Sequence, residues 1–398
     1  MKTLKSMRLH IGIFGKTNVG KSSLLNHITG QAISIVSDIA GTTTDVVEKS
    51  MELLPIGPVN FLDTAGIDDK TALSDERIEK TLKILNRVDI ALVVCDYEGI
   101  DEYEKSLIEK FKELNIPYII IVNKTDIKKI SDEKLARLKE FSDIVFETSV
   151  LNDSDLVFKF KETVIKLLPD DFVNPPQIVG DLVPAKSTVI LVIPIDKEAP
   201  KGRIILPQVQ VLRDLLDSNC MSIAVKESEL KDALENLKTP PSLVVTDSQA
   251  FKQVAEIVPE NIPLTSFSIL FARLKGDLDA FTKGAQAVEE LQNGDKVLIL
   301  ESCTHHAIED DIGRVKIPNL IRKKTGKDLI FENIAGHDFP DISDYKLIIH
   351  CGACMTNRRE VLSRILKANQ KNVPITNYGI VISYCLGILE RALRVFDK

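Results

Sequence analysis

Short apolar runs alternate with segments of helical spacing along the whole chain. This alternation predicts helices packed on parallel β-sheets, an α/β fold. In residues 1–170 the runs typical of strands are His10–Phe14, Pro58–Leu62, Ile90–Val94, Tyr118–Val122 and Ile144–Glu147. A helical pattern follows the first of them from Ser23. Because ligands of open parallel sheets bind beyond the carboxyl ends of strands, we expect functional residues directly after these runs.

A proline-bearing linker at Val173–Pro176 precedes a second alternating series. Its expected strands are Thr188–Pro194, Met221–Lys226, Ser242–Thr246 and Pro263–Phe267, and its expected helices are Gln208–Asp217, Ser228–Leu237 and Ser248–Ile257. No titratable cluster or glycine loop accompanies the series. The apolar strand Val189–Ile195 is of the type that pairs across a subunit interface. We therefore expect residues 175–270 to be a dimerisation domain of a homodimer.

Residues 271–398 continue the alternation and predict a third α/β domain. The expected strands are Val297–Leu300, Asp328–Glu332, Lys346–His350 and Pro374–Thr376, and the expected helices are Ala280–Leu291, Pro318–Lys324, Arg358–Ala368 and Ile380–Phe396. Cys95, Cys220 and Cys385 lie beside or within apolar elements of the chain. We expect these three cysteines to be core residues.

Composition narrows the class of protein. At 398 residues the chain predicts two or three domains, and 44% apolar with 27% charged residues is ordinary for a soluble globular protein. A formal charge of -7 argues against nucleic acid as the main partner. No apolar run approaches the ~20 residues that span a bilayer, and no apolar segment follows the basic residues of the N-terminus. We expect a cytoplasmic protein, whose six cysteines indicate metal binding or catalysis before disulfides.

Residues Gly15–Ser22 form a GxxxxGKS phosphate-binding loop between a strand and a helix, the setting that this loop requires. Its backbone N–H groups are expected to wrap the phosphates at the positive end of the helix. Lys21 would reach the β- and γ-phosphates, and the Ser22 hydroxyl would ligate Mg²⁺. The nucleotide-binding positions of the loop are Gly15, Asn18, Val19, Gly20, Lys21, Ser22 and Ser23.

Three further motifs follow in order, each at the end of a strand. The first is the DTAG sequence at residues 63–66, whose aspartate can hold Mg²⁺ through water and whose glycine N–H can meet the γ-phosphate. In an NKTD sequence the carboxylate accepts two hydrogen bonds from guanine that adenine cannot supply, which selects GTP over ATP. A TSV sequence fits the loop that touches the guanine oxygen. The residues concerned are Asp63, Gly66, Asn123, Lys124, Asp126, Ser149 and Val150. The four motifs together predict a Ras-like GTPase domain at residues 1–170.

Three cysteines lie in two short segments, each after an apolar run that predicts a buried strand. Cys303 opens a CxH sequence with His305, and His350 precedes Cys351 and Cys354 in an HCxxC sequence. If the two strands belong to one parallel sheet, both segments lie at the carboxyl ends of its strands and can be close together. Three thiolates with only imidazole nearby make a soft site, which selects iron–sulfur clusters or zinc over magnesium or calcium.

Residues 39–45, with the sequence IAGTTTD, resemble switch I of the TrmE/Era group of GTPases. The resemblance implies that Thr43 closes over Mg²⁺ and that Asn18 coordinates K⁺ beside the phosphates. Ile67 occupies the place of the catalytic glutamine of Ras-like proteins, and its hydrophobic side chain cannot orient water. Residues 75–78 resemble the segment that carries the TrmE catalytic glutamate, which nominates Glu76, although helix starts favour acids anyway. Lys21, Thr43 and Glu76 are thus the expected catalytic residues.

A TrmE-like GTPase combined with a C-terminal CxH and HCxxC pattern resembles the HydF family, the GTPase scaffold proteins of [FeFe]-hydrogenase maturation. The resemblance implies a GTPase domain, a dimerisation domain at 175–270 and a cluster-binding domain at 271–398. It implies a [4Fe-4S] cluster on Cys303, Cys351 and Cys354. It further implies that a two-iron H-cluster precursor is received from the radical-SAM maturases HydE and HydG and delivered to apo-[FeFe]-hydrogenase.

The sequence pattern supplies three cysteine ligands for such a cluster and does not identify the fourth ligand. A [4Fe-4S] cluster needs four external ligands, normally all thiolates. The fourth ligand is therefore expected to be weaker and exchangeable, with His305, His350, a carboxylate or water as candidates. Because adjacent strand residues point to opposite faces, His350 is alternatively a residue that contacts a sulfur or orients a partner.

Three other interpretations compete with the iron–sulfur hypothesis. The first is an RNA- or ribosome-associated TrmE/Era-like GTPase with a structural zinc site, since zinc accepts three cysteines and a histidine. The net negative charge of the chain weakens this first interpretation. The second is a redox-active CxxC pair, which needs no distant Cys303. The third is a structural protein with buried cysteines, which leaves the adjacent histidines unexplained.

Overall fold

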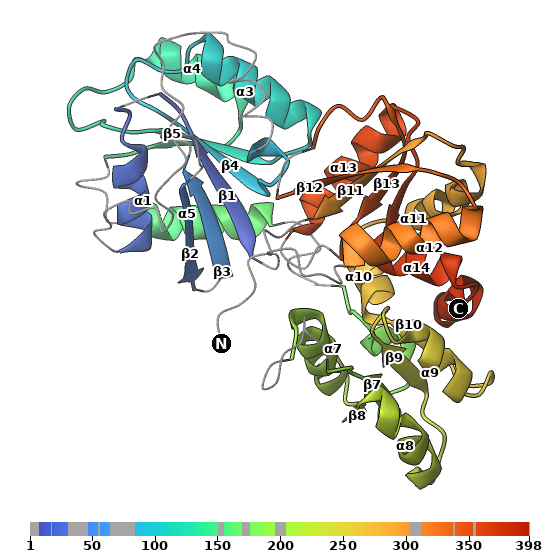
Figure 1. Ribbon diagram of the computed structural model, residues 1–398. Coiled ribbons are helices and arrows are strands. Elements are labelled where there is room, and N and C mark those ends of the chain that lie inside the picture. The colour runs from blue at the N-terminus through green and yellow to red at the C-terminus, as the bar shows by residue number, and fades with distance from the viewer. Residues whose placement is uncertain are drawn as a thin grey trace. The chain divides into compact units, whose positions relative to one another are not determined.

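The structure, a computed structural model, describes residues 8–16, 18–30, 47–54, 56–63, 84–149, 155–168, 176–195, 204–301, 312–336, 339–352 and 356–397. The chain divides into two compact units, residues 1–175 and residues 176–398 (Figure 1). Every sheet of the described residues is wholly or mainly parallel and carries helices, which confirms the expected α/β fold. Among the described residues, no helix is long and apolar enough to cross a membrane.

The first unit is built on a sheet with the strand order β2-β3-β1-β4-β5-β6. Its strands are β1 (Leu9–Phe14), β2 (Val47–Leu53), β3 (Gly57–Asp63), β4 (Ile90–Cys95), β5 (Tyr118–Val122) and β6 (Val145–Glu147). The described helices are α1 (Lys21–Thr29), α3 (Glu102–Glu113), α4 (Asp132–Phe141) and α5 (Leu156–Leu167). Helices α1 and α5 pack on one face through residues such as Leu24 and Phe160, and α3 and α4 pack on the other through Phe111 and Leu138 (Figure 1). The strand β2, which pairs antiparallel with β3, was not expected from the sequence.

The first sheet of the second unit is parallel and has the order β10-β9-β7-β8. Its strands are β7 (Thr188–Val192), β8 (Met221–Val225), β9 (Leu243–Thr246) and β10 (Leu264–Ser266), and its helices are α7 (Leu206–Asp217), α8 (Leu230–Asn236) and α9 (Phe251–Ile257). The apolar strand that was expected to pair across a subunit interface is β7, and this expectation is wrong. Strand β7 lies between β8 and β9 and pairs with both, so it offers no free edge.

The second sheet of this unit is also parallel, with the order β12-β11-β13-β14. Its strands are β11 (Lys296–Glu301), β12 (Ile330–Ala335), β13 (Tyr345–His350) and β14 (Ile375–Asn377). The accompanying helices are α10 (Phe267–Lys275), α11 (Leu278–Gln286), α12 (Ile317–Thr325), α13 (Arg358–Gln370), α14 (Tyr378–Cys385) and α15 (Leu389–Leu393). The single helix expected over Ile380–Phe396 is broken after α14, where Gly387 adopts a left-handed φ of 73°.

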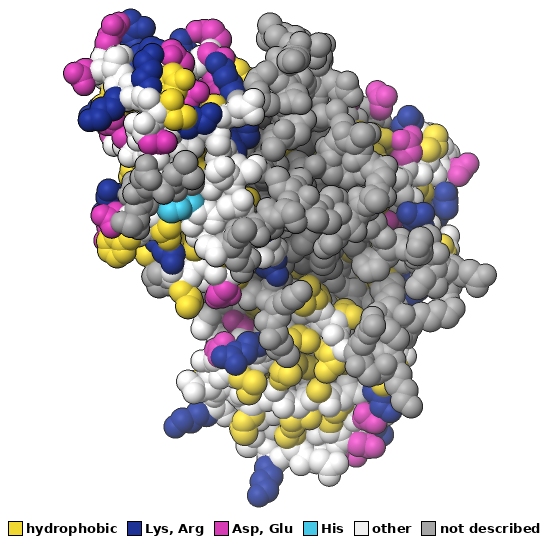
Figure 2. Space-filling model, turned by 90° about the vertical axis from the view of Figure 1, so that its left-hand side faces the viewer, with side chains coloured by type: hydrophobic (Ala, Val, Ile, Leu, Met, Phe, Trp, Pro, Cys, Tyr) yellow, Lys and Arg dark blue, Asp and Glu magenta, His cyan; other side chains and the backbone are white. Residues whose placement is uncertain are grey.

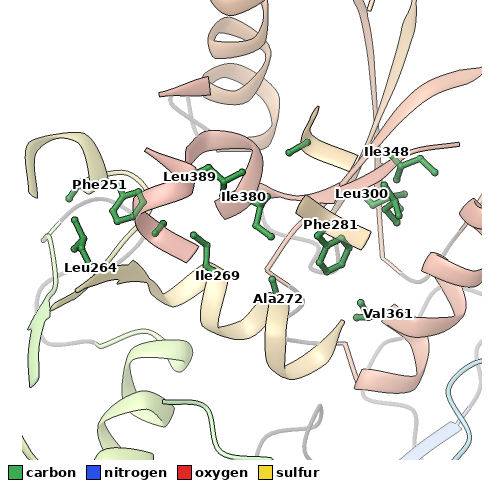
Figure 3. Packing of buried hydrophobic residues seen from close by; sticks show 14 of the residues in the cluster. Phe251, Leu264, Ile269, Ala272, Phe281, Leu300, Ile348, Val361, Ile380 and Leu389 are labelled. Atoms are coloured by element: carbon green, nitrogen blue, oxygen red, sulfur yellow. The ribbon is translucent and has the colours of Figure 1, made fainter. Parts of the chain in front are cut away.

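Helix α10 joins the two sheets of the second unit and was not expected from the sequence. The predicted domain boundary between residues 270 and 271 falls inside it. One hydrophobic core contains Ile269 of this helix and side chains from both sheets, such as Leu264, Leu300 and Ile348 (Figure 3). The two sheets are therefore stabilised by shared burial of apolar surface.

Candidate functional sites: a phosphate-binding loop and a cysteine-bearing sheet edge

The phosphate-binding loop follows β1 directly and leads into α1. Gly15 has a φ of 135°, and a Cβ atom there would lie 2.1 Å from the Val94 carbonyl oxygen. Gly20 has a φ of 95°, and a Cβ atom there would lie 2.3 Å from Nδ2 of Asn123. Both positions therefore require glycine, because neighbouring atoms occupy the space that a side chain would need.

Lys21 is the buried cation of this loop. It is 7% exposed, and its ammonium group donates hydrogen bonds to the carbonyl oxygens of Gly15 and Lys16. The positive charge thus lies within the curve of the loop, at the N-terminus of α1, where the helix dipole also favours an anion. Ser22 is half-buried and Ser23 exposed.

The NKTD residues contact the phosphate-binding loop, a role that the sequence motif alone did not indicate. Asn123 donates from Nδ2 to the carbonyl oxygen of Val19 at 3.0 Å. The ammonium group of Lys124 donates to the carbonyl oxygen of Asn18. Asn18 itself adopts a left-handed backbone conformation, with a φ of 63°. These two bonds hold the loops at the ends of β1 and β5 together.

The base-binding positions lie at the same edge of the sheet. Asp126 is exposed, three residues beyond Asn123. The backbone N–H of Thr148 donates to the carbonyl oxygen of Val122 at 2.8 Å, which fixes the start of the TSV loop. Ser149 is 7% exposed, and within the described residues its hydroxyl has no hydrogen-bond partner. A buried polar atom of this kind fits a ligand at this loop.

Several of the expected nucleotide-site residues lie outside the described residues: Thr43, Gly66, Glu76 and Val150. The backbone of Asp63 is described. It ends β3 and pairs with Ile13 of β1, immediately before the phosphate-binding loop. The sheet therefore brings the start of the DTAG sequence next to the loop, as the order of the motifs predicts.

A second set of contacts, missed in the sequence, ties the phosphate-binding loop to α3. The Lys16 ammonium pairs with Asp101 at 2.6 Å, and the Lys16 backbone N–H donates to Oε1 of Glu104 at 3.2 Å. Glu104 is fully buried, and this burial, with the neighbouring Asp101, raises its pKa to about 7. The position of the loop thus depends on the capping box that begins α3.

The cysteine segments follow two adjacent strands. In the parallel pair β11 and β13, Leu300 is opposite His350. The backbone N–H of Cys351 donates to the carbonyl oxygen of Leu300 at 2.9 Å, and Cys351 is 9% exposed. Cys303 continues the chain beyond β11, but Cys303, His305 and Cys354 lie outside the described residues. Within the described part, no three His, Cys, Asp or Glu side chains gather as a metal site.

Both ring nitrogens of His350 are engaged in hydrogen bonds. The Arg364 guanidinium donates to Nε2 at 2.7 Å, because arginine has no acceptor. The proton therefore sits on Nδ1, which donates to the carbonyl oxygen of Cys351 at 2.8 Å. Burial, and then the charge of Arg364, lowers the pKa of His350 to about 3, so the ring is neutral at physiological pH. In this arrangement His350 orients the Cys351 backbone and has no lone pair left for a metal.

The remaining cysteines with described positions lie in apolar surroundings. Cys95 and Cys220 are buried, and Cys385 is half-buried. Burial raises the pKa of the Cys95 and Cys385 thiols to about 12. Thiols held in this protonated form are poor metal ligands, since the thiolate is the ligand.

Three stretches of the chain match models of known families. Residues 10–124 match a family described as 50S ribosome-binding GTPase. Residues 178–276 match the hydrogen maturase F dimerization domain, and residues 279–395 match the hydrogen maturase F tetramerization domain. The first unit therefore contains a GTPase domain, and the second unit carries domains named for oligomerisation.

Several curated GTPases each match less than half of this chain. The tRNA modification GTPase MnmE of Mesoplasma florum is 38% identical over 154 residues, which cover 38% of this chain and 33% of that protein. GTPase Der of Wolinella succinogenes is 36% identical over 171 residues, covering 40% of this chain and 36% of that protein. The chain thus spans about a third of the length of these relatives. Era of Aquifex aeolicus, a solved structure, is 22% identical with a TM-score of 0.33, and the match covers 55% of this chain and 93% of that one.

Proposed function

Because this chain is a GTPase that belongs to the hydrogen maturase F family, we propose that it is also an iron–sulfur scaffold of [FeFe]-hydrogenase maturation. It would receive the two-iron H-cluster precursor from HydE and HydG and deliver it to the apo-hydrogenase in the cytoplasm. The pairing of Leu300 with His350 carries this proposal. The register makes β11 and β13 neighbours, and the CxH and HCxxC segments follow these two strands in the sequence. Three thiolates brought together there would form a soft metal site.

In the GTPase half, Lys21 would hold the β- and γ-phosphates of GTP, and Ser22, Thr43 and Asp63 would hold Mg²⁺. Asp126 would select guanine. Glu76 would act in hydrolysis, in place of the glutamine that this chain lacks at Ile67.

We expect GTP hydrolysis to be faster in K⁺ than in Na⁺. The carbonyl oxygen of Asn18 accepts a hydrogen bond from Lys124, which fixes Asn18 within the phosphate-binding loop. A monovalent cation coordinated there would supply the charge that other GTPases take from an arginine finger, an effect of ~10³-fold or more. Initial rates in matched KCl and NaCl buffers measure this effect, and equal rates would exclude it.

In the cluster half, Cys303, Cys351 and Cys354 would hold the [4Fe-4S] cluster. The fourth ligand would be exchangeable, as a scaffold that docks and releases a second cluster requires. His305 is the imidazole candidate for this position. The hydrogen bonds of His350 argue against ligation by its ring, and they give it a role that the sequence did not suggest, orientation of the Cys351 backbone.

The test is metal analysis of the full chain purified without oxygen. We expect about four irons and four sulfides per chain, as a [4Fe-4S] cluster requires, an absorption spectrum that bleaches with dithionite, and little zinc. Stoichiometric zinc without iron would instead support the RNA- or ribosome-associated GTPase with a structural zinc site. A matched preparation of Cys220→Ala is the control, because Cys220 is a core cysteine outside the motif.

For the homodimer, strand β8 supports a contact with a second copy, because in the described part of the chain it lies at the edge of its sheet and pairs with β7 alone. Met221 of this strand is 58% exposed, and Leu216 of the preceding helix is 56% exposed. Figure 2 shows hydrophobic side chains gathered in the lower part of one face of the molecule. A strand edge flanked by apolar side chains pairs readily with a second copy.

A further inference from the structure

Glu104 is a buried carboxylate that contacts two separate parts of the GTPase unit. It is fully buried and lies in the first turn of α3. Its Oε2 accepts a hydrogen bond from the backbone N–H of Asp101 at 3.0 Å, and its Oε1 accepts one from the backbone N–H of Lys16 at 3.2 Å. The first bond belongs to the capping box and stabilises the start of the helix. The second bond adds nothing to the helix and acts on the phosphate-binding loop.

The peptide group between Gly15 and Lys16 is held on both of its sides. Its N–H donates to Glu104, and its carbonyl oxygen, that of Gly15, accepts a hydrogen bond from the Lys21 ammonium. Because a peptide group is planar, a fixed direction of the N–H also fixes the direction of the carbonyl group. A charged acceptor at the N–H also polarises the peptide, which strengthens the hydrogen bond at its carbonyl oxygen. Glu104 thus acts on the position of Lys21 through a single peptide group.

Three elements of the described chain bring charged or titratable groups to Glu104. The loop brings the Lys16 ammonium, which attracts the carboxylate, and the start of α3 brings the Asp101 carboxylate, which repels it. Strand β4 brings the Cys95 thiol, whose pKa is raised to about 12 by burial and then by the charges of Glu104 and Asp96. Burial, and then Asp101, raises the pKa of Glu104 to about 7. Cys95 therefore stays a neutral thiol, and Glu104 changes its charge near neutral pH.

We propose that Glu104 is a positioning residue for GTP hydrolysis, which as a carboxylate orients the Gly15–Lys16 peptide and, through it, the Lys21 ammonium. The inference rests on the proposed role of Lys21 in holding the GTP phosphates. A carboxylate accepts from both backbone N–H groups, whereas a protonated carboxyl turns one oxygen into a donor. The rate of hydrolysis therefore falls as the pH decreases through about 7.

The first test is the Glu104→Gln substitution in the full chain. Glutamine is an ordinary member of a capping box, but it offers one acceptor oxygen in place of two, so it cannot serve both N–H groups. At pH 8 we expect kcat/KM for GTP to fall about tenfold, the effect of losing one hydrogen bond to a charged group. Glu102→Gln is the matched control and leaves kcat/KM unchanged, because the Glu102 side chain lies in the same turn of α3 and is 91% exposed.

A pH profile separates positioning from a general structural role. The ratio of wild-type to Glu104→Gln kcat/KM cancels any titration of GTP itself. We expect this ratio to fall from about ten at pH 8 to about two at pH 6, because the protonated carboxyl of the wild type resembles the amide of the variant. A ratio that is constant between these pH values would overturn the inference.

Asp101→Asn provides a second measurement that does not depend on the folding of the Glu104 variant. Asparagine is as good an N-cap residue as aspartate, so the start of α3 is kept. The substitution removes a negative charge beside Glu104, and the pKa of Glu104 is therefore lowered. We expect the midpoint of the pH profile of kcat/KM to move to lower pH than in the wild type. An unmoved midpoint would assign the titration to another group and contradict the inference.

A double-mutant cycle tests whether Glu104 acts through Lys21. In the Lys21→Ala background we expect Glu104→Gln to change kcat/KM by less than about twofold, because the ammonium that the peptide positions is absent. A loss of equal size in both backgrounds would indicate a general structural role and overturn the inference. Wild-type turnover in Lys21→Ala would overturn the proposed role of Lys21 and this inference together. Wild-type kcat/KM in Glu104→Gln, in a chain that depends on Lys21, would overturn this inference alone.

Discussion

Lys21→Ala is expected to lower the rate of GTP hydrolysis by ~10³-fold, because it removes the buried cation of the phosphate-binding loop. Deletion of one such preorganised contact to a developing charge costs ~10²–10³-fold in rate. Lys21 also donates to the carbonyl oxygens of Gly15 and Lys16, so its loss loosens the loop itself. Nucleotide affinity is therefore expected to fall as well.

Single-turnover hydrolysis and fluorescent-nucleotide binding measure the two effects of this substitution. Lys105→Ala is the matched control, since Lys105 is a lysine of α3 in a surface pair with Glu102. The iron content of the Lys21→Ala chain is expected to match that of the wild type, because the cysteine segments lie in the other unit. Normal turnover in Lys21→Ala would contradict the assignment of the loop.

Asp126→Asn is expected to change the base specificity from guanine to xanthine, by at least ~10²-fold in the ratio of XTP to GTP affinity. The carboxylate accepts hydrogen bonds from N1–H and the exocyclic amine of guanine. The asparagine amide presents a donor to that amine but can bond the second carbonyl oxygen of xanthine. A site that matches hydrogen-bonding groups discriminates strongly, since a mismatch leaves them unpaired.

Competition between XTP and GTP for the same site measures this change. Asp132→Asn, in the exposed first turn of α4, controls for the loss of one surface charge near the site. An unchanged preference for GTP would show that the NKTD sequence does not contact the base in this chain.

The strand ends were predictable from the sequence because their signals are local. A glycine loop between a strand and a helix has a fixed spacing, and Gly15 and Gly20 meet the structural demands of that spacing. The contacts behind the loop were not predictable. The bond from Asn123 to Val19 spans 104 residues, and no pattern within either segment signals it. The same holds for Glu104, whose partner Lys16 is distant in sequence.

Helix α10 was missed for a different physical reason. Amphipathic periodicity identifies a helix that has one apolar face and one polar face. Between Phe267 and Lys275 nearly every side chain is buried, because both sheets of the second unit pack on this helix. A continuous apolar run is compatible with a strand or with a buried helix, so the pattern did not distinguish them. Strand β2 was missed because charged residues interrupt its apolar pattern at the edge of the sheet.

The shared core of the second unit has a consequence for the order in which the chain folds during synthesis. The first sheet, residues 188–266, leaves the ribosome early, yet part of its apolar surface is covered by Leu389 and Ala392. Arg391 donates from Nη1 to the carbonyl oxygen of Ala255, 136 residues earlier in the chain. We therefore expect the nascent first sheet to remain incompletely packed, with apolar surface exposed, until the C-terminal helices emerge from the ribosome. During that interval the growing chain is a substrate for chaperones, and two neighbouring nascent chains can exchange their C-terminal helices.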